Sequence, residues 1–181
     1  MRGTVLAELQ SISPADDIER GHLNDAIAWV RSGAPIFRTV RPATPPKHLV
    51  SYFAVVDEDE ILLVDHKNAQ LWLPSGGHVE PDENPRKTVV RELKEELGIE
   101  LDQGVIGPPL MVTCTPTVGL VAGHTDVSLW YVIQADRTAP VSYDDKEFNA
   151  VGWFKFDQVP LQRSDPHLGR FLAKLRAGSR A

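Results

Sequence analysis

A short segment near the middle of the chain constrains the fold most, because it encodes both ends of a helix. Asn84 suits the N-cap position, and Pro85 suits the first turn, where a missing backbone N–H costs nothing. Gly98 suits the left-handed position that follows a helix end, and the apolar Ile99 stands beyond it. The sequence therefore predicts a helix from about Pro85 to Leu97.

Two faces of this helix differ in chemistry. At about 100° per residue, one arc carries three carboxylates, Glu92, Glu95 and Glu96. Two like-charged pairs, at i,i+3 and i,i+4, each cost roughly 0.2–0.5 kcal/mol on an exposed helix. Mg²⁺ prefers oxygen ligands, so the cluster suits a divalent ion, although a solvated acidic face also explains so short a stretch. The apolar arc consists of Val89, Val90, Leu93 and Leu97.

A longer spacing pattern includes this helix, G-x5-E-x7-R-E-U-x-E-E-x-G-U, with U a bulky aliphatic residue. Every constrained position of the pattern is matched in this chain, by Gly77, Glu83, Arg91, Glu92, Leu93, Glu95, Glu96, Gly98 and Ile99. The pattern resembles the signature of the Nudix hydrolase family, strictly over Gly77–Ile99 and more loosely from about residue 48 to 159. Ser75 in the lead-in is a departure, because many members carry glycine there.

The resemblance implies a fold and a reaction. The fold is the α+β (α/β) class, an α/β/α sandwich with a mixed β-sheet between helices. The reaction is hydrolysis of a phosphoanhydride bond in a nucleoside diphosphate derivative, with Mg²⁺ or Mn²⁺ as cofactor. Bound metal screens the phosphate charge and lowers the pKa of a water molecule.

The resemblance also implies roles for the box residues. Glu95 and Glu96 ligate the metal, and Glu92 is a further ligand or the base that acts on the attacking water. In relatives the backbone carbonyl of Gly76 often completes the metal site. Two further residues lie outside the metal ligands. The resemblance implies that Arg91 pairs with Glu83 and orients the other acids.

Family members commonly carry another acid after the box. Glu147, shortly before a predicted strand, is the candidate catalytic acid in this chain, and an ordinary charged turn explains it equally well. Asp144 and Asp145 compete with it for the role.

One strand of alternating polarity is expected to line the nucleotide pocket. His124, Asp126 and Trp130 share one of its faces, and the indole is of a kind that stacks on a base, although a core tryptophan is the favoured explanation. Just before the box, His66 and Lys67 are candidates to meet phosphate oxygens. The predicted substrate contacts are Trp72, Gly77, His78, His124, Asp126 and Trp130.

The six histidines do not predict a zinc site. They stand at positions 22, 48, 66, 78, 124 and 167, without a close pair and without a neighbouring cysteine. Structural zinc sites normally show tighter ligand spacing along the sequence, so the sequence argues against a zinc site.

The other patterns predict one domain with an appendage. Strands are expected at 49–56, 61–65, 110–115, 126–134 and 151–154, and a helix at 165–176. A helical stripe that ends at Ser32-Gly33, with a break at Gly21 as an option, precedes the proline-rich connector Arg41–Lys47. Residues 1–47 are therefore expected to form a helical appendage and connector, and residues 48–181 the Nudix domain.

Composition excludes several classes of protein. The 181 residues, 42% hydrophobic, suit one domain, and no apolar run reaches the length of a membrane span. The N-terminus does not resemble a signal peptide, and the lone Cys114 cannot form an internal disulfide, so a cytoplasmic protein is expected. A net charge of −6 argues against nucleic-acid binding. Small nucleotides are the expected partners, and a homodimer is left open.

Several functions remain to be separated. A house-cleaning pyrophosphohydrolase of (deoxy)nucleoside triphosphates is the first expectation. An ADP-ribose or nucleotide-sugar pyrophosphatase is the alternative, because Pro116 stands where such relatives often carry proline. A non-catalytic nucleotide-sensing module is expected to lose box acids, and none is lost here. An isoprenoid diphosphate isomerase needs a suitably placed cysteine, whereas Cys114 lies after the box.

Overall fold

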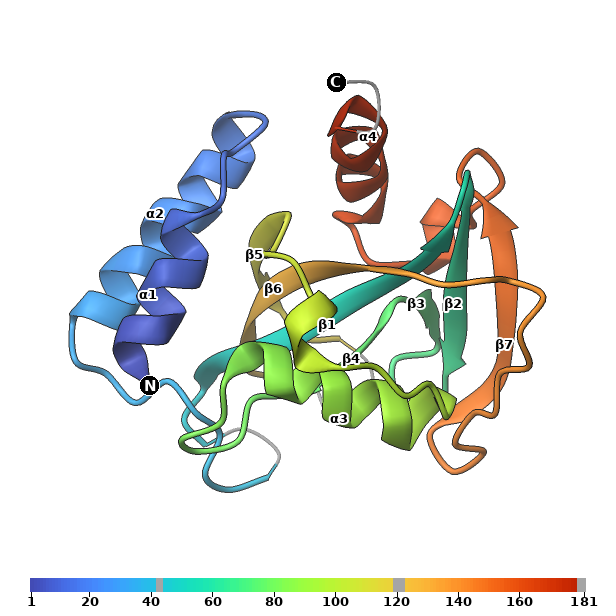
Figure 1. Cartoon of the computed structure of the whole chain (residues 1–181). Helices are drawn as coiled ribbons and strands as arrows, with labels where there is room; N and C mark the ends of the chain where they lie inside the picture. Colours follow the sequence, from blue (N-terminus) through green and yellow to red (C-terminus); the bar gives the residue numbers. More distant parts are fainter. Residues whose placement is uncertain (42–43, 119–122, 179–181) are drawn as a thin grey trace.

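In the residues that the structure describes, 1–41, 44–118 and 123–178, a seven-stranded mixed sheet lies between helices (Figure 1). The structure is a computed structural model. Its helices are α1 (Arg2–Gln10), α2 (Asp17–Arg31), α3 (Pro85–Leu97) and α4 (Leu168–Gly178), with short 3-10 turns η1 (Gln103–Val105) and η3 (Leu161–Arg163). Its strands are β1 (Lys47–Asp57), β2 (Glu60–His66), β3 (Leu71–Leu73), β4 (Ser75–His78), β5 (Met111–Pro116), β6 (Thr125–Gln134) and β7 (Phe148–Lys155).

The long strand β1 organises the sheet. The strand order is β3-β2-β1-β6-β5, and β4 and β7 pair in addition with β1 and β2. β1 runs parallel to β6 over its whole length, while its other pairings are antiparallel. Residues 50–53 of β1 pair with β4 and residues 55–57 pair with β2, so one strand connects the box lead-in with the rest of the sheet.

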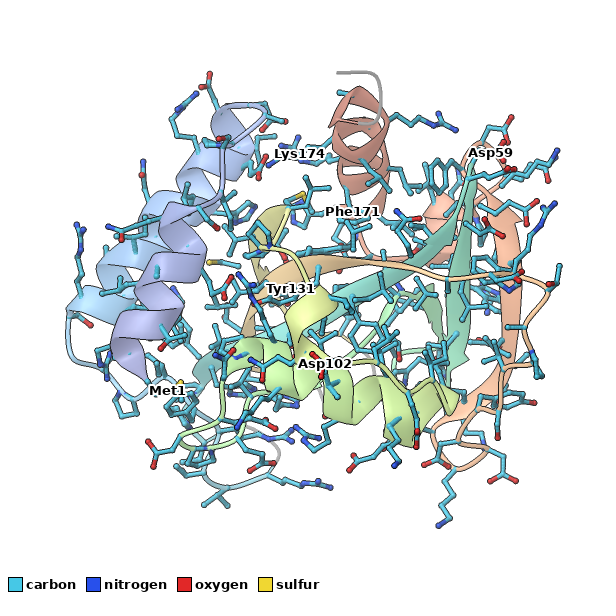
Figure 2. All side chains as sticks on the ribbon, viewed as in Figure 1. Met1, Asp59, Asp102, Tyr131, Phe171 and Lys174 are labelled. Carbon is cyan, nitrogen blue, oxygen red and sulfur yellow. The ribbon has the colours of Figure 1, made fainter. Side chains whose placement is uncertain are left out.

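Each face of the sheet has its own core, because side chains alternate along a strand. On one face Phe53 packs with Leu93 of α3 and with residues of α1 and α2. On the other face Ala54 packs with Phe171 of α4. Tyr131 and Phe171 accordingly lie on opposite sides of the sheet (Figure 2). Helices thus cover both faces, which confirms the expected α/β/α sandwich.

The box helix α3 has the bounds that its capping residues predict. The Asn84 side chain accepts a hydrogen bond from Arg86 N at 2.9 Å. Gly98 has a φ of 66°, and Ile99 N donates to Leu93 O at 3.1 Å, which closes the helix end. Three members of the apolar arc are buried, Val89, Leu93 and Leu97, and Val90 is half-buried. The predicted apolar arc is therefore confirmed.

The N-terminal helices pack against the rest of the chain. Val5 and Leu9 of α1 and Val30 of α2 belong to the same core as α3. Glu8 of α1 makes a bidentate ion pair with Arg86 in the first turn of α3, with N–O distances of 2.8 and 3.1 Å. α2 is continuous through position 21, so the optional break there is wrong. The division into residues 1–47 and 48–181 stays a prediction.

Four elements differ from the expectation, strands β3 and β4 and helices α1 and α4. The glycine-bearing stretch from Leu73 to Gly77, expected as a loop, contains the end of β3 and most of β4. Helix α1 was not expected, since its first residue has no side-chain cap. α4 begins at Leu168 rather than near residue 165. None of the helices among the described residues has both the length and the apolar character needed to cross a membrane.

Asp165→Asn is expected to stabilise the protein near neutral pH and to change little in acid. Burial raises the pKa of the Asp165 carboxyl to about 6, so the folded chain disfavours its ionised form. The free energy of unfolding therefore falls as the pH rises from about 4 to about 6, and the total loss is about 3 kcal/mol once the pH is above that range. Asparagine keeps the oxygen that accepts from His167 N at 2.7 Å.

Denaturant unfolding of both proteins at about pH 4 and about pH 7.5 measures this difference. A variant that gains equally at both pH values would contradict the titration argument.

Candidate active site

Two glycines bring the sheet against the box helix. A Cβ on Gly77 would lie 1.9 Å from Glu92 Oε1, so a side chain there would displace this carboxylate. A Cβ on Gly76 would meet backbone atoms, Ser51 O at 2.6 Å and Tyr52 Cα at 2.9 Å. Both glycines therefore allow close approach, and the expectation that they lie beside the carboxylates is confirmed.

Glu96 is buried beneath the glycine pair, with 7% of its surface exposed. The Ser75 hydroxyl donates to its Oε2 atom, and Gly76 N–H is a second donor. Burial raises the pKa of Glu96 to about 8, and the neighbouring Glu92 and Glu147 carboxylates add to the rise. The helical wheel groups Glu96 with Glu92 and Glu95 on the acidic arc, and an exposed position is expected there; this expectation is wrong, because β4 covers this part of α3. Ser75, the departure from the family pattern, is the residue that binds it.

Arg91 connects the remaining acids. Its guanidinium forms a fork with Glu83, with both N–O distances 3.1 Å, which confirms the expected pair. The same group donates to Glu92 Oε1 at 2.5 Å and to Glu95 Oε2 at 3.4 Å. A further hydrogen bond, 3.2 Å long, reaches the backbone oxygen of His78. Arg91 thus links α3 to the end of β4 and compensates part of the acidic charge.

The turn before β7 lies at the end of α3. Asp144 N donates to the backbone oxygen of Glu96 at 3.0 Å, and the Glu147 carboxylate raises the pKa of Glu92 and of Glu96. For Glu92 the larger cause of the raised pKa is burial. The structure therefore brings the candidate acid Glu147, which is exposed, near the box carboxylates.

The donor set fits a hard divalent cation. Glu92 and Glu96 are partly or fully buried, and burial and mutual repulsion penalise their ionised forms. Glu95 is adjacent, with 61% of its side chain exposed. A cation relieves such repulsion, and carboxylate and carbonyl oxygens are the ligands that Mg²⁺ takes.

Trp130 belongs to the core and not to a base-binding surface. It has no exposed surface, and its Nε1 donates to Thr113 Oγ1 at 3.0 Å. Its ring contacts those of Tyr52 and Phe171, at centroid distances of 4.5 and 5.0 Å. No ring face is left for a nucleotide, so the suggested stacking role is corrected to a packing role. Trp72 is half-buried, and its role in binding stays a prediction.

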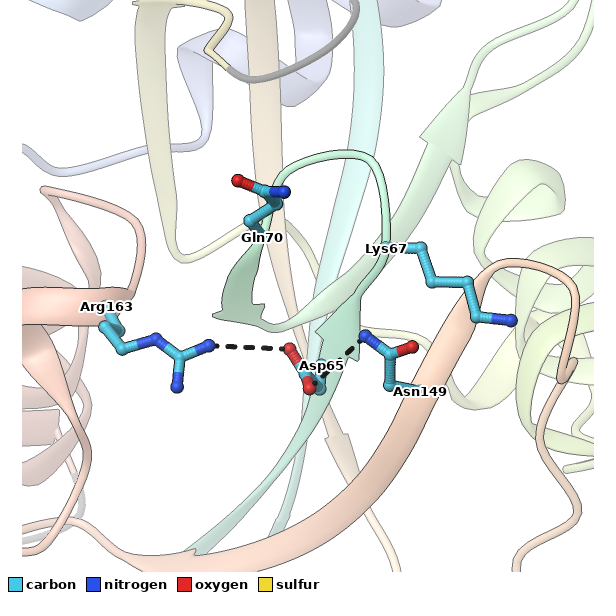
Figure 3. Close-up of a pocket in the computed structure, with 5 residues that line it drawn as sticks. All are labelled: Asp65, Lys67, Gln70, Asn149 and Arg163. Carbon is cyan, nitrogen blue, oxygen red and sulfur yellow. Dashed lines mark hydrogen bonds and ion pairs between the residues drawn. The ribbon is translucent and has the colours of Figure 1, made fainter.

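A polar pocket of about 540 Å³ opens beside the turn of Glu147 (Figure 3). Lys67 lines it and donates through its backbone N–H to Glu147 O at 3.0 Å. Across the pocket Asp65 pairs with Arg163 at 3.8 Å and accepts from Asn149 at 3.4 Å. The Lys67 ammonium also donates to the backbone oxygen of Asp145. The expected phosphate contact Lys67 therefore lies in a pocket next to the turn that carries Glu147, whereas Arg163 was not anticipated.

The sheet gathers three histidines that are far apart in sequence. The register of β1 and β6 sets His48 opposite Asp126, and His78 lies on the neighbouring strand β4. Together with His124, these residues offer ligand atoms that all lie within 4.8 Å of one another. Burial and the nearby Arg38 charge lower the pKa of His78 to about 2. Sequence spacing does not detect this cluster, because strand pairing and not sequence separation decides which side chains meet.

Comparison with known proteins adds a family match. Residues 46–175 match the family model described as NUDIX domain. CTP pyrophosphohydrolase of Escherichia coli is 46% identical over 56 residues, which are 28% of this chain and 42% of that protein. A MutT-like protein of Streptomyces ambofaciens is 28% identical over 134 residues, 73% of this chain and 80% of that protein. The chain thus spans less than half of the Escherichia coli relative.

A solved structure agrees with the fold. The crystal structure of a MutT NUDIX hydrolase from Burkholderia pseudomallei superposes with a TM-score of 0.60 and 26% sequence identity. The superposition covers 71% of this chain and 97% of that one. The N-terminal helices lie outside the family match, which begins at residue 46.

Proposed function

Since the chain belongs to the Nudix hydrolase family, we propose that it hydrolyses a (deoxy)nucleoside triphosphate to the monophosphate and pyrophosphate. The family match identifies the chain as a hydrolase that acts on pyrophosphate bonds. The choice of a triphosphate rests on the likeness, over 56 residues, to a protein named as CTP pyrophosphohydrolase. The ADP-ribose alternative rests on Pro116 alone.

The observation that carries the catalytic proposal is the position of Glu92 and Glu96 against the glycine pair of β4. Glu95, Glu96 and the backbone oxygen of Gly76 are proposed to hold Mg²⁺ or Mn²⁺. When bound, the ion screens the phosphate charge and lowers the pKa of a water molecule. Arg91 keeps Glu92 in place through their 2.5 Å hydrogen bond.

Glu92 is proposed to accept the proton of the attacking water. The water oxygen forms a bond to phosphorus, the anhydride P–O bond breaks, and pyrophosphate leaves. Glu147 is the proposed second acid, because it is the exposed carboxylate that raises the pKa of both box acids. Lys67 and Arg163 line the adjoining pocket and are proposed to contact the leaving phosphates. His78, His124 and Asp126 are proposed to lie at the edge of the nucleotide site.

A substrate panel tests the proposal. The full chain is assayed with Mg²⁺ or Mn²⁺ against the common (deoxy)nucleoside triphosphates, ADP-ribose, a nucleotide sugar and a dinucleoside tetraphosphate. Nucleoside monophosphate and pyrophosphate from the triphosphates are the expected products. Faster release of AMP and ribose 5-phosphate from ADP-ribose would select the alternative. A folded protein that binds nucleotides and hydrolyses none would select the non-catalytic sensing module.

Removal of the metal is expected to abolish hydrolysis. The box carboxylates repel an anionic substrate unless a cation lies between them. Turnover should fall to background in excess chelator and return when Mg²⁺ or Mn²⁺ is added, as measured by pyrophosphate release. Unchanged turnover in excess chelator contradicts the metal-dependent mechanism.

A further inference from the structure

The histidine cluster has the geometry of a metal-ligand set. Three Nε2 atoms surround one carboxylate oxygen, Asp126 Oδ1, at 3.3 Å from His48, 3.5 Å from His124 and 3.9 Å from His78. Zinc–nitrogen bonds of 2.0–2.1 Å in a tetrahedron separate neighbouring ligand atoms by about 3.3–3.4 Å. Two of the three distances therefore match the edges of a tetrahedral site, and the third is slightly longer.

A hydrogen bond to the backbone shows that Nδ1 of His48, the most buried ring of the cluster, carries a proton. His48 is fully buried, and its Nδ1 lies 2.8 Å from Pro45 O, an oxygen that can only accept. His48 Nδ1 must therefore carry a proton, and the other ring nitrogen, Nε2, faces Asp126 Oδ1 at 3.3 Å. Neither atom has a hydrogen bond among the described residues. Two such buried polar atoms that face each other are satisfied by a proton or by a metal ion between them.

The outer contacts resemble those that orient metal-binding histidines. Such ligands commonly donate their other ring N–H to a carbonyl or hydroxyl oxygen. His48 does so to Pro45 O, and His124 Nδ1 lies 3.2 Å from Thr117 Oγ1. Two ligands thus present Nε2 inward with the opposite nitrogen engaged.

We propose that His48, His78, His124 and Asp126 bind a transition-metal ion of the Zn²⁺ type, at a site separate from the box carboxylates. Imidazole nitrogens select zinc and its neighbours in the transition series over Mg²⁺, which requires oxygen ligands. His48 belongs to β1, His78 to β4 and Asp126 to the start of β6, and His124 immediately precedes β6. The ion would therefore fasten the lead-in strand of the box to the centre of the sheet.

Arg38 opposes the ion at one ligand. Its Nη1 lies 3.2 Å from His78 Nε2, the same nitrogen that faces Asp126. This hydrogen bond and a metal bond at His78 exclude each other. Removing the guanidinium in Arg38→Ala should therefore tighten zinc binding severalfold.

Zinc titration tests the site. The full chain is freed of metal with a chelator, dialysed, and titrated with Zn²⁺ in excess Mg²⁺ against a chromophoric zinc indicator. One zinc ion per chain is expected to bind, and added Mg²⁺ should not displace it. His78→Gln and Asp126→Asn each remove one ligand and should weaken binding about 100-fold or more. These residues are chosen because His48 is fully buried and its replacement risks the fold.

Two controls separate this site from others. His167→Gln removes a histidine that packs against His22, away from the cluster, and should bind zinc like the parent. Glu96→Gln damages the box and should also keep zinc. Substituted Co²⁺ gives an independent readout, since a tetrahedral site has a stronger visible absorption than an octahedral one.

The outcomes are distinct. Zinc affinity that is equal in His78→Gln, Asp126→Asn and the parent overturns the proposal, as does a folded parent that binds no zinc. In the second case protons and Arg38 hold the cluster together. Loss of zinc in Glu96→Gln alone would assign the ion to the box. None of these results depends on which nucleotide is hydrolysed, or on whether any is.

Discussion

Glu96→Gln is expected to lower hydrolysis by roughly 10²–10³-fold while the fold stays intact. The change keeps the shape of the side chain and removes one proposed metal ligand. The Ser75 hydroxyl can donate to the amide oxygen or accept from the amide nitrogen, so the buried contact survives. The loss should therefore appear in kcat at saturating Mg²⁺, and not in the amount of folded protein.

Thermal unfolding separates this effect from a structural one. Burial raises the pKa of Glu96, so its charge is unfavourable in the metal-free protein, and the glutamine variant should be at least as stable as the parent. Added Mg²⁺ should raise the Tm of the parent more than that of the variant, because a ligand stabilises the state that binds it. Glu100→Gln is the matched control, since Glu100 is exposed and pairs with Lys94 outside the site. A metal-free Glu96→Gln protein that unfolds, while its folded fraction keeps parental turnover, would assign Glu96 a structural role.

Leu93→Ala is expected to show the reverse pattern, a large loss of stability with little loss of catalysis. Leu93 is fully buried in the core beneath the box helix. Truncation of such a side chain costs about 2–5 kcal/mol, through lost burial and the cavity that remains. Denaturant unfolding measures the cost, and turnover per folded molecule should stay near that of the parent.

Val90→Ala provides the comparison for Leu93→Ala, because Val90 lies on the same helix but is only half-buried. Its cost should be clearly smaller. A Leu93→Ala protein with parental stability would contradict the packing of α3, whereas a folded variant with no turnover would show that core packing positions the acids.

Local signals made the box helix predictable, and tertiary contacts decided what was missed. Asn84 and Gly98 act within one helical turn, so sequence alone places both ends of α3. Strand β4 contains the pair Gly76-Gly77, which disfavours a strand by itself, and it forms because β1 supplies partners. The burial of Glu96 follows from that pairing, and a helical wheel contains no information about it.

The same reasoning explains the remaining misassignments. Trp130 shares a strand face with Asp126, but the start of β6 lies at the histidine cluster and its middle lies under α4. Alternation with a period of two predicts which face of a strand a side chain lies on, but it does not predict which elements cover that face. His48 had no sequence signal at all, since its proximity to His124 depends on the parallel register of β1 and β6.

The ion pair between Glu8 and Arg86 has a consequence for how the molecule unfolds. A chain that began at residue 46, where the family match begins, would leave the Arg86 guanidinium without its carboxylate. It would also uncover the apolar surface that Val5 and Leu9 now shield. The first helices should therefore melt together with the box helix α3 in one cooperative transition. A shortened chain should expose enough apolar surface to bind a hydrophobic dye and to aggregate.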